Sequence, residues 1–277
     1  MYKKIIWPVI VLIASLLALI FLSGFVYSVF ITTGDDELPV DEQAVPTDDT
    51  TEEPIAGMPE EAIGERSVID PNPEEWETVL VMGDSLGSGV GDEDGLGFDQ
   101  RYLELLSQDD SLERELTNIS VPGFVSSQLA DQLDTGEYDL DIETADLILI
   151  SIGGNDLNRL YFQDNETMIA EFDETLSAFL SNLESVLTTI RSLNPEAQLA
   201  LIGLYDPYNL EDQEINRLLL EWNHASRLAA SADARLAYIP TYEAFQYHLA
   251  DYLSDDLFHP NGAGYQTIAE SLYQVLN

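Results

Sequence analysis

Two short motifs, far apart in the chain, carry side chains suited to nucleophilic chemistry. Gly83-Asp84-Ser85-Leu86 places a serine on a glycine-rich turn directly after an apolar run. A serine hydroxyl is a weak nucleophile until a neighbouring base takes its proton. Near the carboxyl terminus, Asp256 stands three residues before His259. An acid at that spacing can hold one ring nitrogen of the histidine, which leaves the other nitrogen free to accept the serine proton.

Two glycine-containing segments between these motifs supply candidate hydrogen-bond donors. Val121-Pro122-Gly123 ends in a glycine whose backbone a ligand can approach closely and whose N–H is free to donate. Gly153-Gly154-Asn155-Asp156 adds the Asn155 amide, which can donate to developing negative charge, while Asp156 is a candidate N-cap of the next helix. Taken singly, each motif also fits an ordinary turn or a helix cap. Their order along the chain is what favours a shared site.

Few other residues are candidates for chemistry. The chain has three histidines and no cysteine, which excludes thiolate nucleophiles and thiolate metal sites. His224 lies in a predicted helix and His248 in an aromatic run, so both are expected to be packing or surface residues. The acidic run 92–95 lacks the ligand alternation of a calcium loop and is interpreted as a solvated loop. With no phosphate-binding loop and no histidine cluster, neither a metal nor a cofactor is expected.

The elements that must position these motifs alternate along the chain. Apolar, β-branched runs predict buried parallel strands, and helical patterns lie between them. The strands are expected at 78–82, 116–121, 147–152, 199–204 and 236–240, and the helices at 100–107, 126–133, 169–193, 212–230 and 264–276. This alternation predicts an α/β domain with a doubly wound parallel sheet. Ligands bind such sheets beyond the carboxyl ends of the strands, which is where the motifs lie.

Together the four motifs resemble the GDSL, or SGNH, hydrolase family over about residues 76–277. The resemblance rests on Gly-Asp-Ser-Leu at 83–86, the segment Asn118 to Gly123, Gly-Gly-Asn-Asp at 153–156 and Asp-x-x-His-Pro at 256–260. It implies a three-layer α/β/α, flavodoxin-like fold with a five-stranded parallel sheet. One departure is Gly87, where relatives more often carry a side chain; a glycine here could loosen the turn that holds the serine, but it leaves every role in the site filled.

What the resemblance implies for the site is a serine–histidine–aspartate triad. Carried over by motif, Ser85 is the nucleophile, His259 its base and Asp256 the acid that orients the base. The oxyanion donors are the N–H groups of Ser85 and Gly123 and the side chain of Asn155. The implied activity is hydrolysis of acyl esters through an acyl-serine intermediate, with no cofactor. Two substrate classes stay open: lysophospholipid or other lipid esters, and acetyl groups on cell-wall or polysaccharide sugars. The alternative is a noncatalytic module of this fold that binds at the cell envelope.

The amino-terminal part of the chain differs from the rest in composition. Lys3 and Lys4 precede a stretch from Ile5 to Ile31 without a charged residue, long enough for a helix that crosses a bilayer. Residues 1–31 are therefore predicted to be a basic tip and a transmembrane signal anchor rather than a cleaved signal peptide. Residues 32–75, which are acidic and proline-containing, are predicted to be a disordered linker, and residues 76–277 the hydrolase domain. The positive-inside tendency places that domain outside the cytoplasm, at the cell membrane. Gly91-Asp92-Glu93 and Gly203 to Pro207 are similar to bacterial lysophospholipase-like members with such a segment.

The formal net charge of −42 restricts the possible partners. A protein surface with this much negative charge repels nucleic acid. Either adaptation to high salt or binding of a cationic partner would account for the charge, and the even scatter of the acids along the chain favours salt.

Overall fold

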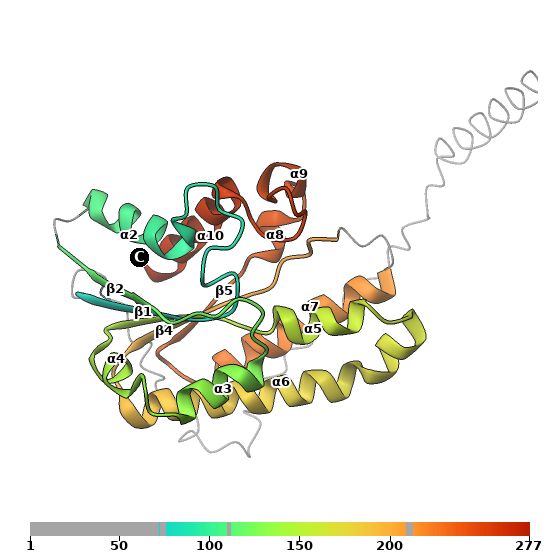
Figure 1. Cartoon of the computed structure of the whole chain (residues 1–277), viewed down its shortest axis with the longest axis horizontal. Helices are drawn as coiled ribbons and strands as arrows, with labels where there is room; N and C mark the ends of the chain where they lie inside the picture. Colours follow the sequence, from blue (N-terminus) through green and yellow to red (C-terminus); the bar gives the residue numbers. More distant parts are fainter. Residues whose placement is uncertain (1–71, 73–75, 110–111, 209–212) are drawn as a thin grey trace, which may run out of the picture. The chain divides into compact units, whose positions relative to one another are not determined.

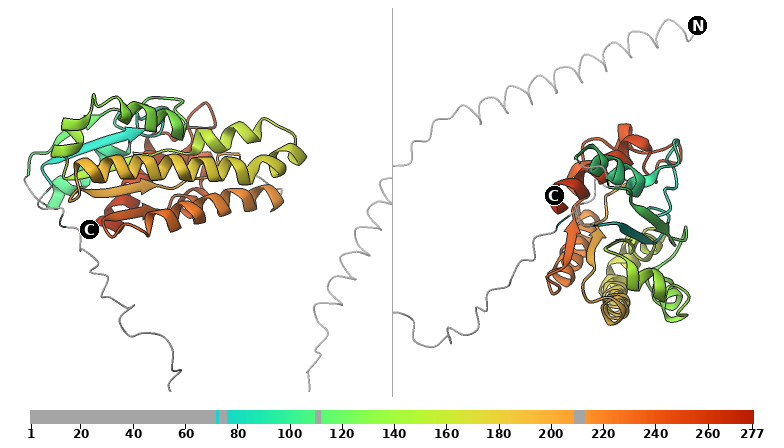
Figure 2. Two further views of the ribbon diagram at one scale, coloured as in Figure 1. Left: turned by 90° about the horizontal axis from the view of Figure 1, so that it is seen from below. Right: turned by 90° about the vertical axis from the view of Figure 1, so that its left-hand side faces the viewer.

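A parallel sheet of five strands forms the centre of the computed structural model, which describes residues 72, 76–109, 112–208 and 213–277 (Figure 1). The strand order is β2-β1-β3-β4-β5. The strands are β1 Thr78–Gly83, β2 Glu115–Asn118, β3 Leu147–Ser151, β4 Gln198–Ile202 and β5 Leu236–Ile239. Every adjacent pair is parallel. The sheet lies between two layers of helices (Figure 2), so the predicted three-layer α/β/α fold is confirmed for this part of the chain.

Alternation of side chains along the strands supplies two separate apolar cores. Val79 and Val81 of β1 face one core, and Leu80 and Met82 face the other. The first core is covered by α2 Gly97–Asp109, α8 Tyr242–Phe245, α9 Leu249–Tyr252 and α10 Gly262–Leu276. The second is covered by α3 Ser126–Asp134, α4 Asp139–Thr144, α5 Gly154–Tyr161, α6 Asn165–Leu193 and α7 Gln213–Ala230. Because both faces are covered, the central strands are apolar at nearly every position, as predicted.

The element boundaries differ from the prediction where side chains intervene. Strand β2 ends at Asn118 rather than Val121, because the Asn118 side chain accepts the Ser120 N–H (3.0 Å) and turns the chain there. Helix α6 begins before Ile169, because Asp164 caps it by accepting the Thr167 N–H (3.0 Å). The short helices α4, α5, α8 and α9, of four to eight residues, are absent from the prediction. They contain too few turns to show a hydrophobic period.

The predicted amino-terminal segments lie almost wholly outside the residues that the structure describes. The transmembrane anchor at residues 1–31 lies outside the described residues, as does the linker at 32–75 apart from residue 72. Among the helices that the structure does describe, none combines the length and apolar character needed to cross a bilayer.

Candidate active site

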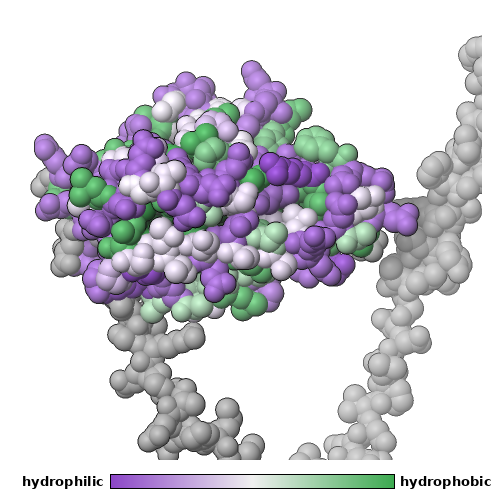
Figure 3. Space-filling view, turned by 60° about the horizontal axis from the view of Figure 1, so that its bottom comes forward, coloured by the Kyte–Doolittle hydropathy of each residue, from purple (hydrophilic) through white to green (hydrophobic). Residues whose placement is uncertain are grey.

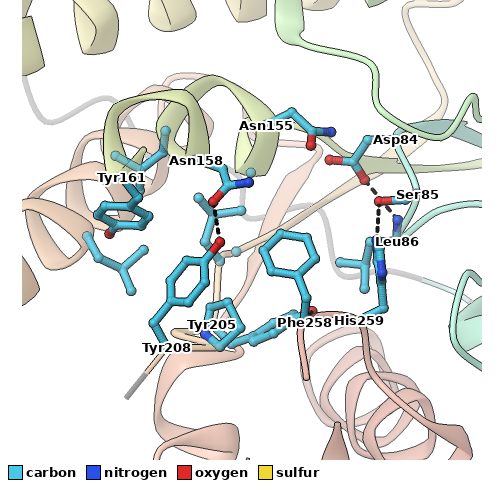
Figure 4. Close-up of a pocket in the computed structure, with 16 residues that line it drawn as sticks. Asp84, Ser85, Leu86, Asn155, Asn158, Tyr161, Tyr205, Tyr208, Phe258 and His259 are labelled. Carbon is cyan, nitrogen blue, oxygen red and sulfur yellow. Dashed lines mark hydrogen bonds between the residues drawn. The ribbon is translucent and has the colours of Figure 1, made fainter. Parts of the chain in front are cut away.

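Ser85, His259 and Asp256 form one hydrogen-bonded chain at the carboxyl edge of the sheet. Figure 4 shows its bond between Ser85 and His259. The His259 Nε2 atom lies 2.9 Å from the Ser85 Oγ atom, and the His259 Nδ1 atom lies 2.6 Å from Asp256 Oδ2. Ser85 and His259 are 174 positions apart in the sequence, and the fold brings them into contact. With Nδ1 held by the carboxylate, Nε2 is the ring nitrogen available to accept the serine proton.

A tight turn from Ser254 to His259 fixes the acid against the histidine. The Ser254 and His259 backbones are joined by an N–H···O bond of 2.8 Å, and Leu257 adopts the left-handed conformation at φ 57°. Burial raises the pKa of Asp256, but hydrogen bonds from the His259 ring, the backbone N–H groups of His259 and Phe258 and the Ser254 hydroxyl outweigh it and hold that pKa well below its usual range. Asp256 is therefore a carboxylate at neutral pH, able to stabilise an imidazolium.

The turn that presents Ser85 depends on a glycine at the end of β1. Gly83 has φ 132°, and a Cβ there would lie 1.8 Å from the Ser151 carbonyl oxygen of β3. The Asp84 carboxylate accepts hydrogen bonds from the Leu86 N–H (3.0 Å) and the Ser151 hydroxyl (3.2 Å), so it ties the turn to β3. These contacts hold the Ser85 side chain toward His259.

Gly87 does not loosen this turn. A Cβ at this position would lie 2.3 Å from the Ser120 hydroxyl and 2.8 Å from the Ser151 hydroxyl. The Gly87 carbonyl also accepts a hydrogen bond from the Asn118 side chain (2.8 Å). The glycine is therefore what lets the turn pack closely against the neighbouring loops.

Asp84 is a buried acid whose protonation is expected to affect stability. Burial raises its pKa from 3.8 to about 7, and the hydrogen bonds from Leu86 and Ser151 only partly oppose this. The pKa of Asp84 is higher in the folded chain than in the unfolded chain, so protonated Asp84 stabilises the fold. This contribution to the free energy of unfolding is complete below about pH 4 and is lost as the pH rises through 7. The Asp84→Asn variant should therefore be more stable than the wild type at pH 8, by about 4 kcal/mol at most. The difference should vanish near pH 4.

Urea unfolding at pH 4, 6 and 8 measures this difference. The control is Asp131→Asn, which removes one negative charge at an exposed position of α3. Equal stabilisation by the two variants at pH 8 would contradict the raised pKa of Asp84. A gain in stability by Asp84→Asn that does not change with pH would contradict it as well.

The predicted oxyanion donors lie on three segments: the turn after β1, the loop that carries Gly123 and the first turn of α5, the last two joined by a hydrogen bond. Neither the Ser85 nor the Gly123 N–H donates a hydrogen bond to another described residue, so both are free for a ligand. The Asn155 amide donates to the Phe124 carbonyl (2.8 Å), next to Gly123. An amide nitrogen carries two hydrogens, so this bond leaves one donor for a second acceptor.

Asp156, a candidate N-cap by sequence, does not cap its own helix but strengthens the same link. The N-cap of α5 is Gly153, in the left-handed conformation at φ 106°. The Asp156 carboxylate instead accepts the Ser126 N–H (2.9 Å) and the Ser126 hydroxyl at the start of α3. Negative charge at a helix N-terminus is favourable, so Asp156 fixes the loop that carries Gly123.

The acidic run after the serine turn is exposed at Glu93, Asp94 and Gly95, as we interpreted it, and Asp92 is the exception. The Asp92 side chain is fully buried and pairs with Arg101 (2.9 Å), while it accepts backbone N–H groups of its own loop. The Glu93 carboxylate accepts the Gly262 N–H at the start of α10 (2.8 Å). A Cβ on Gly91 would lie 2.9 Å from the His259 Cβ. The loop therefore braces the backbone on which the histidine lies.

Residues that sequence reasoning did not assign to the site include Arg101 and Glu93. Their partners lie in other elements, and although Glu93 is part of the Gly91-Asp92-Glu93 motif, nothing in that motif indicates its contact with Gly262. His224 and His248 are exposed, as predicted. Among the described residues, no group of three or more acidic, histidine or cysteine side chains is arranged to hold a metal ion.

The family model that describes the GDSL-like lipase/acylhydrolase family matches residues 81–267 of the chain. The chain belongs to this family. The resemblance inferred from the motifs is thereby confirmed, and this GDSL-like hydrolase is a carboxylic-ester hydrolase. The matched range contains Ser85, Asn155 and His259.

Relatives and solved structures of similar sequence support the same grouping. The hydrolase is 29% identical to the protein YpmR of Bacillus subtilis over 220 residues, which cover 77% of this chain and 86% of YpmR. It is 30% identical to the spore germination lipase LipC of Bacillus licheniformis over 203 residues, 69% of this chain and 92% of LipC. The crystal structure of the lipase Lip_vut3 from a goat rumen metagenome superposes with a TM-score of 0.65 at 28% identity, covering 71% of this chain and 96% of that one.

The fold is also shared with more distant esterases. The acetylxylan esterase Axe2 of Geobacillus stearothermophilus superposes with a TM-score of 0.56 at 19% identity, covering 72% of this chain and 93% of Axe2. At this identity the likeness concerns the fold.

Proposed function

We propose that this GDSL-like hydrolase cleaves acyl esters by covalent catalysis, with Ser85 as nucleophile, His259 as base and Asp256 as the acid that orients the base. The observation that carries the proposal is the continuous hydrogen-bonded chain from the Ser85 Oγ atom through His259 to Asp256. The N–H groups of Ser85 and Gly123 and the Asn155 amide are the proposed oxyanion donors. A mechanism with these residues in these roles needs neither a metal nor a cofactor.

The proposed reaction has two halves. As the Ser85 Oγ atom bonds to the ester carbonyl carbon, its proton passes to His259 Nε2, and the carbonyl oxygen becomes an oxyanion held by the three donors. The bond from the carbonyl carbon to the alcohol oxygen then breaks, and the alcohol leaves with the proton from His259. A water molecule, deprotonated by His259, then bonds to the carbonyl carbon of the acyl-serine. The bond from that carbon to Ser85 Oγ breaks, the serine oxygen takes the proton back from His259, and the carboxylic acid leaves.

Hydrolysis of p-nitrophenyl esters by the full chain and by its Ser85→Ala variant tests the proposal. Serine-dependent turnover supports it. If the folded wild-type chain turned over no ester of any acyl length, the noncatalytic envelope-binding module would be the better account.

For the surroundings of the enzyme, we propose that residues 1–31 anchor it in the cell membrane, with the hydrolase domain outside the cytoplasm in a salty medium. The support is the uncharged stretch from Ile5 to Ile31 and the net charge of −42. Hydrophilic residues cover much of the face seen in Figure 3. Screening of self-repulsion by salt should then stabilise the domain.

One preparation of the full chain tests both parts of this proposal. Membranes from expressing cells should retain the chain after an alkaline wash, and the solubilised chain should melt at a higher temperature in molar salt than in low salt. Release by the wash would refute the anchor. Equal melting temperatures would refute the adaptation to salt.

A further inference from the structure

A small apolar pocket opens beside the Ser85 hydroxyl and runs along helix α5. Its volume is about 70 Å³. Most of its lining is apolar or aromatic, with Leu86, Leu157, Tyr161, Leu204, Tyr205, Pro207, Tyr208, Leu219 and Phe258 beside the polar residues of the site. Such a lining suits a hydrocarbon chain rather than a sugar ring, because it offers few hydrogen-bond partners.

The direction of this pocket matches the acyl side of a bound ester. The proposed oxyanion donor Asn155 lies in the first turn of α5, and Asn158 follows it on the same face of the helix, since residues three apart are neighbours there. With the carbonyl oxygen at Asn155, the acyl group extends along α5 toward Asn158. The alcohol oxygen must lie near His259 to receive its proton.

A hydrogen bond across the pocket forms its roof. The Tyr208 hydroxyl, on the segment after β4, donates to the Asn158 side-chain oxygen on α5. In Figure 4 this bond lies between Ser85 and Tyr161. Tyr208 is 40% exposed, whereas Leu157 and Leu219, which also line the pocket, are 2% and 3% exposed, so the bond is on the solvent side of the pocket and the two leucines are on its buried side.

Aromatic contacts hold the roof in place on both sides. The Tyr208 ring meets the Tyr161 ring edge-on, with centroids 5.5 Å apart, and the Phe258 ring at 5.9 Å. Phe258 directly precedes His259, and its carbonyl accepts the Tyr205 hydroxyl (2.7 Å). The roof is therefore continuous with the segment that carries the histidine. A chain that displaced Tyr208 would break these contacts as well as the hydrogen bond.

We infer that the Asn158–Tyr208 hydrogen bond limits the substrate to esters of short acyl groups, an inference that rests on the proposed function. The pocket volume of about 70 Å³ is about half of the roughly 150 Å³ at which an apolar cavity binds benzene, a molecule of about six non-hydrogen atoms, so only a few such atoms fit. A butyryl group has that size, while an octanoyl group, with nine, requires the roof to open. Of the two substrate classes, acetyl and similarly short acyl esters are the ones that fit.

Steady-state kinetics with p-nitrophenyl acetate, butyrate and octanoate test the inference in the full chain. The wild type should hydrolyse butyrate with a kcat/KM at least about tenfold above that for octanoate, since one misfitted methylene already costs about tenfold or more. Tyr208→Phe keeps the ring and removes the hydroxyl, and Asn158→Ala removes the acceptor. Each should raise the octanoate-to-butyrate ratio on the order of tenfold, mainly through the KM for octanoate.

The controls separate failure of this inference from failure of the proposed function. Tyr247→Phe removes a hydroxyl from a tyrosine that is 82% exposed and outside the pocket, and it should leave the ratio unchanged. A wild type that prefers octanoate, or two folded variants with the wild-type ratio, would overturn the role of the bond while serine-dependent turnover persists. If the wild type hydrolysed none of the three esters, the proposed function would be overturned, and this inference with it.

Discussion

The Ser85→Ala variant is expected to hydrolyse p-nitrophenyl esters with a kcat on the order of 10⁶-fold below that of the wild type. The hydroxyl is the only group lost, and its oxygen is the atom that bonds to the substrate in the proposed reaction. The oxyanion donors and the pocket remain, so weak rate enhancement over water should persist. The KM should change little, because the Ser85 hydroxyl contributes little to binding of the ground state.

Ser88→Ala is the matched control for this variant. Ser88 lies on the same turn, is exposed, and uses its hydroxyl only to donate to the Ser85 carbonyl (3.2 Å). It should keep kcat within a fewfold of the wild type. Mass spectrometry after treatment with a fluorophosphonate should find the label on Ser85 in the wild type and in Ser88→Ala. Undiminished hydrolysis by Ser85→Ala, or a label on another serine, would refute the assignment of the nucleophile.

The Asn155→Ala variant is expected to lower kcat by roughly 10²–10³-fold, or about 3 kcal/mol in activation free energy. The Asn155 amide would donate to an oxygen that carries full negative charge only in the tetrahedral state. Its loss should therefore slow turnover more than it weakens substrate binding. The variant also loses the bond to the Phe124 carbonyl, which helps to hold the loop that carries Gly123.

Binding of a boronic acid separates the donor role from the loop role. The boronate forms a tetrahedral adduct with the serine and so mimics the proposed intermediate. Asn155→Ala should weaken boronate binding about as much as it lowers kcat. The comparison variant is Asp156→Asn, which perturbs the contacts to Ser126 on the same loop and should lower kcat less. A higher KM with an unchanged kcat in Asn155→Ala would show that the amide binds substrate without stabilising the oxyanion.

Local pattern was enough to predict the strands, the long helices and the residues of the candidate site. Strand β3, Leu147–Ser151, is buried at every position, and its apolar, β-branched run is typical of a strand covered on both faces. Ser85, Asn155 and His259 each lie in a motif of a few residues, and their placement after strands is a property of the chain alone. Because parallel strands end at a common edge, knowing the order of the motifs was sufficient to expect that they meet.

Contacts between distant segments were decided only by the tertiary structure. Glu93 and Gly262 are 169 residues apart, and Tyr208 and Asn158 are 50 apart. No periodicity links such pairs, because their distance depends on how two helical layers pack on one sheet. The burial that raises the pKa of Asp84 has the same origin. The sequence by itself thus determined which residues are suited to ester hydrolysis, while packing decided how firmly they are held and how long an acyl chain fits beside them.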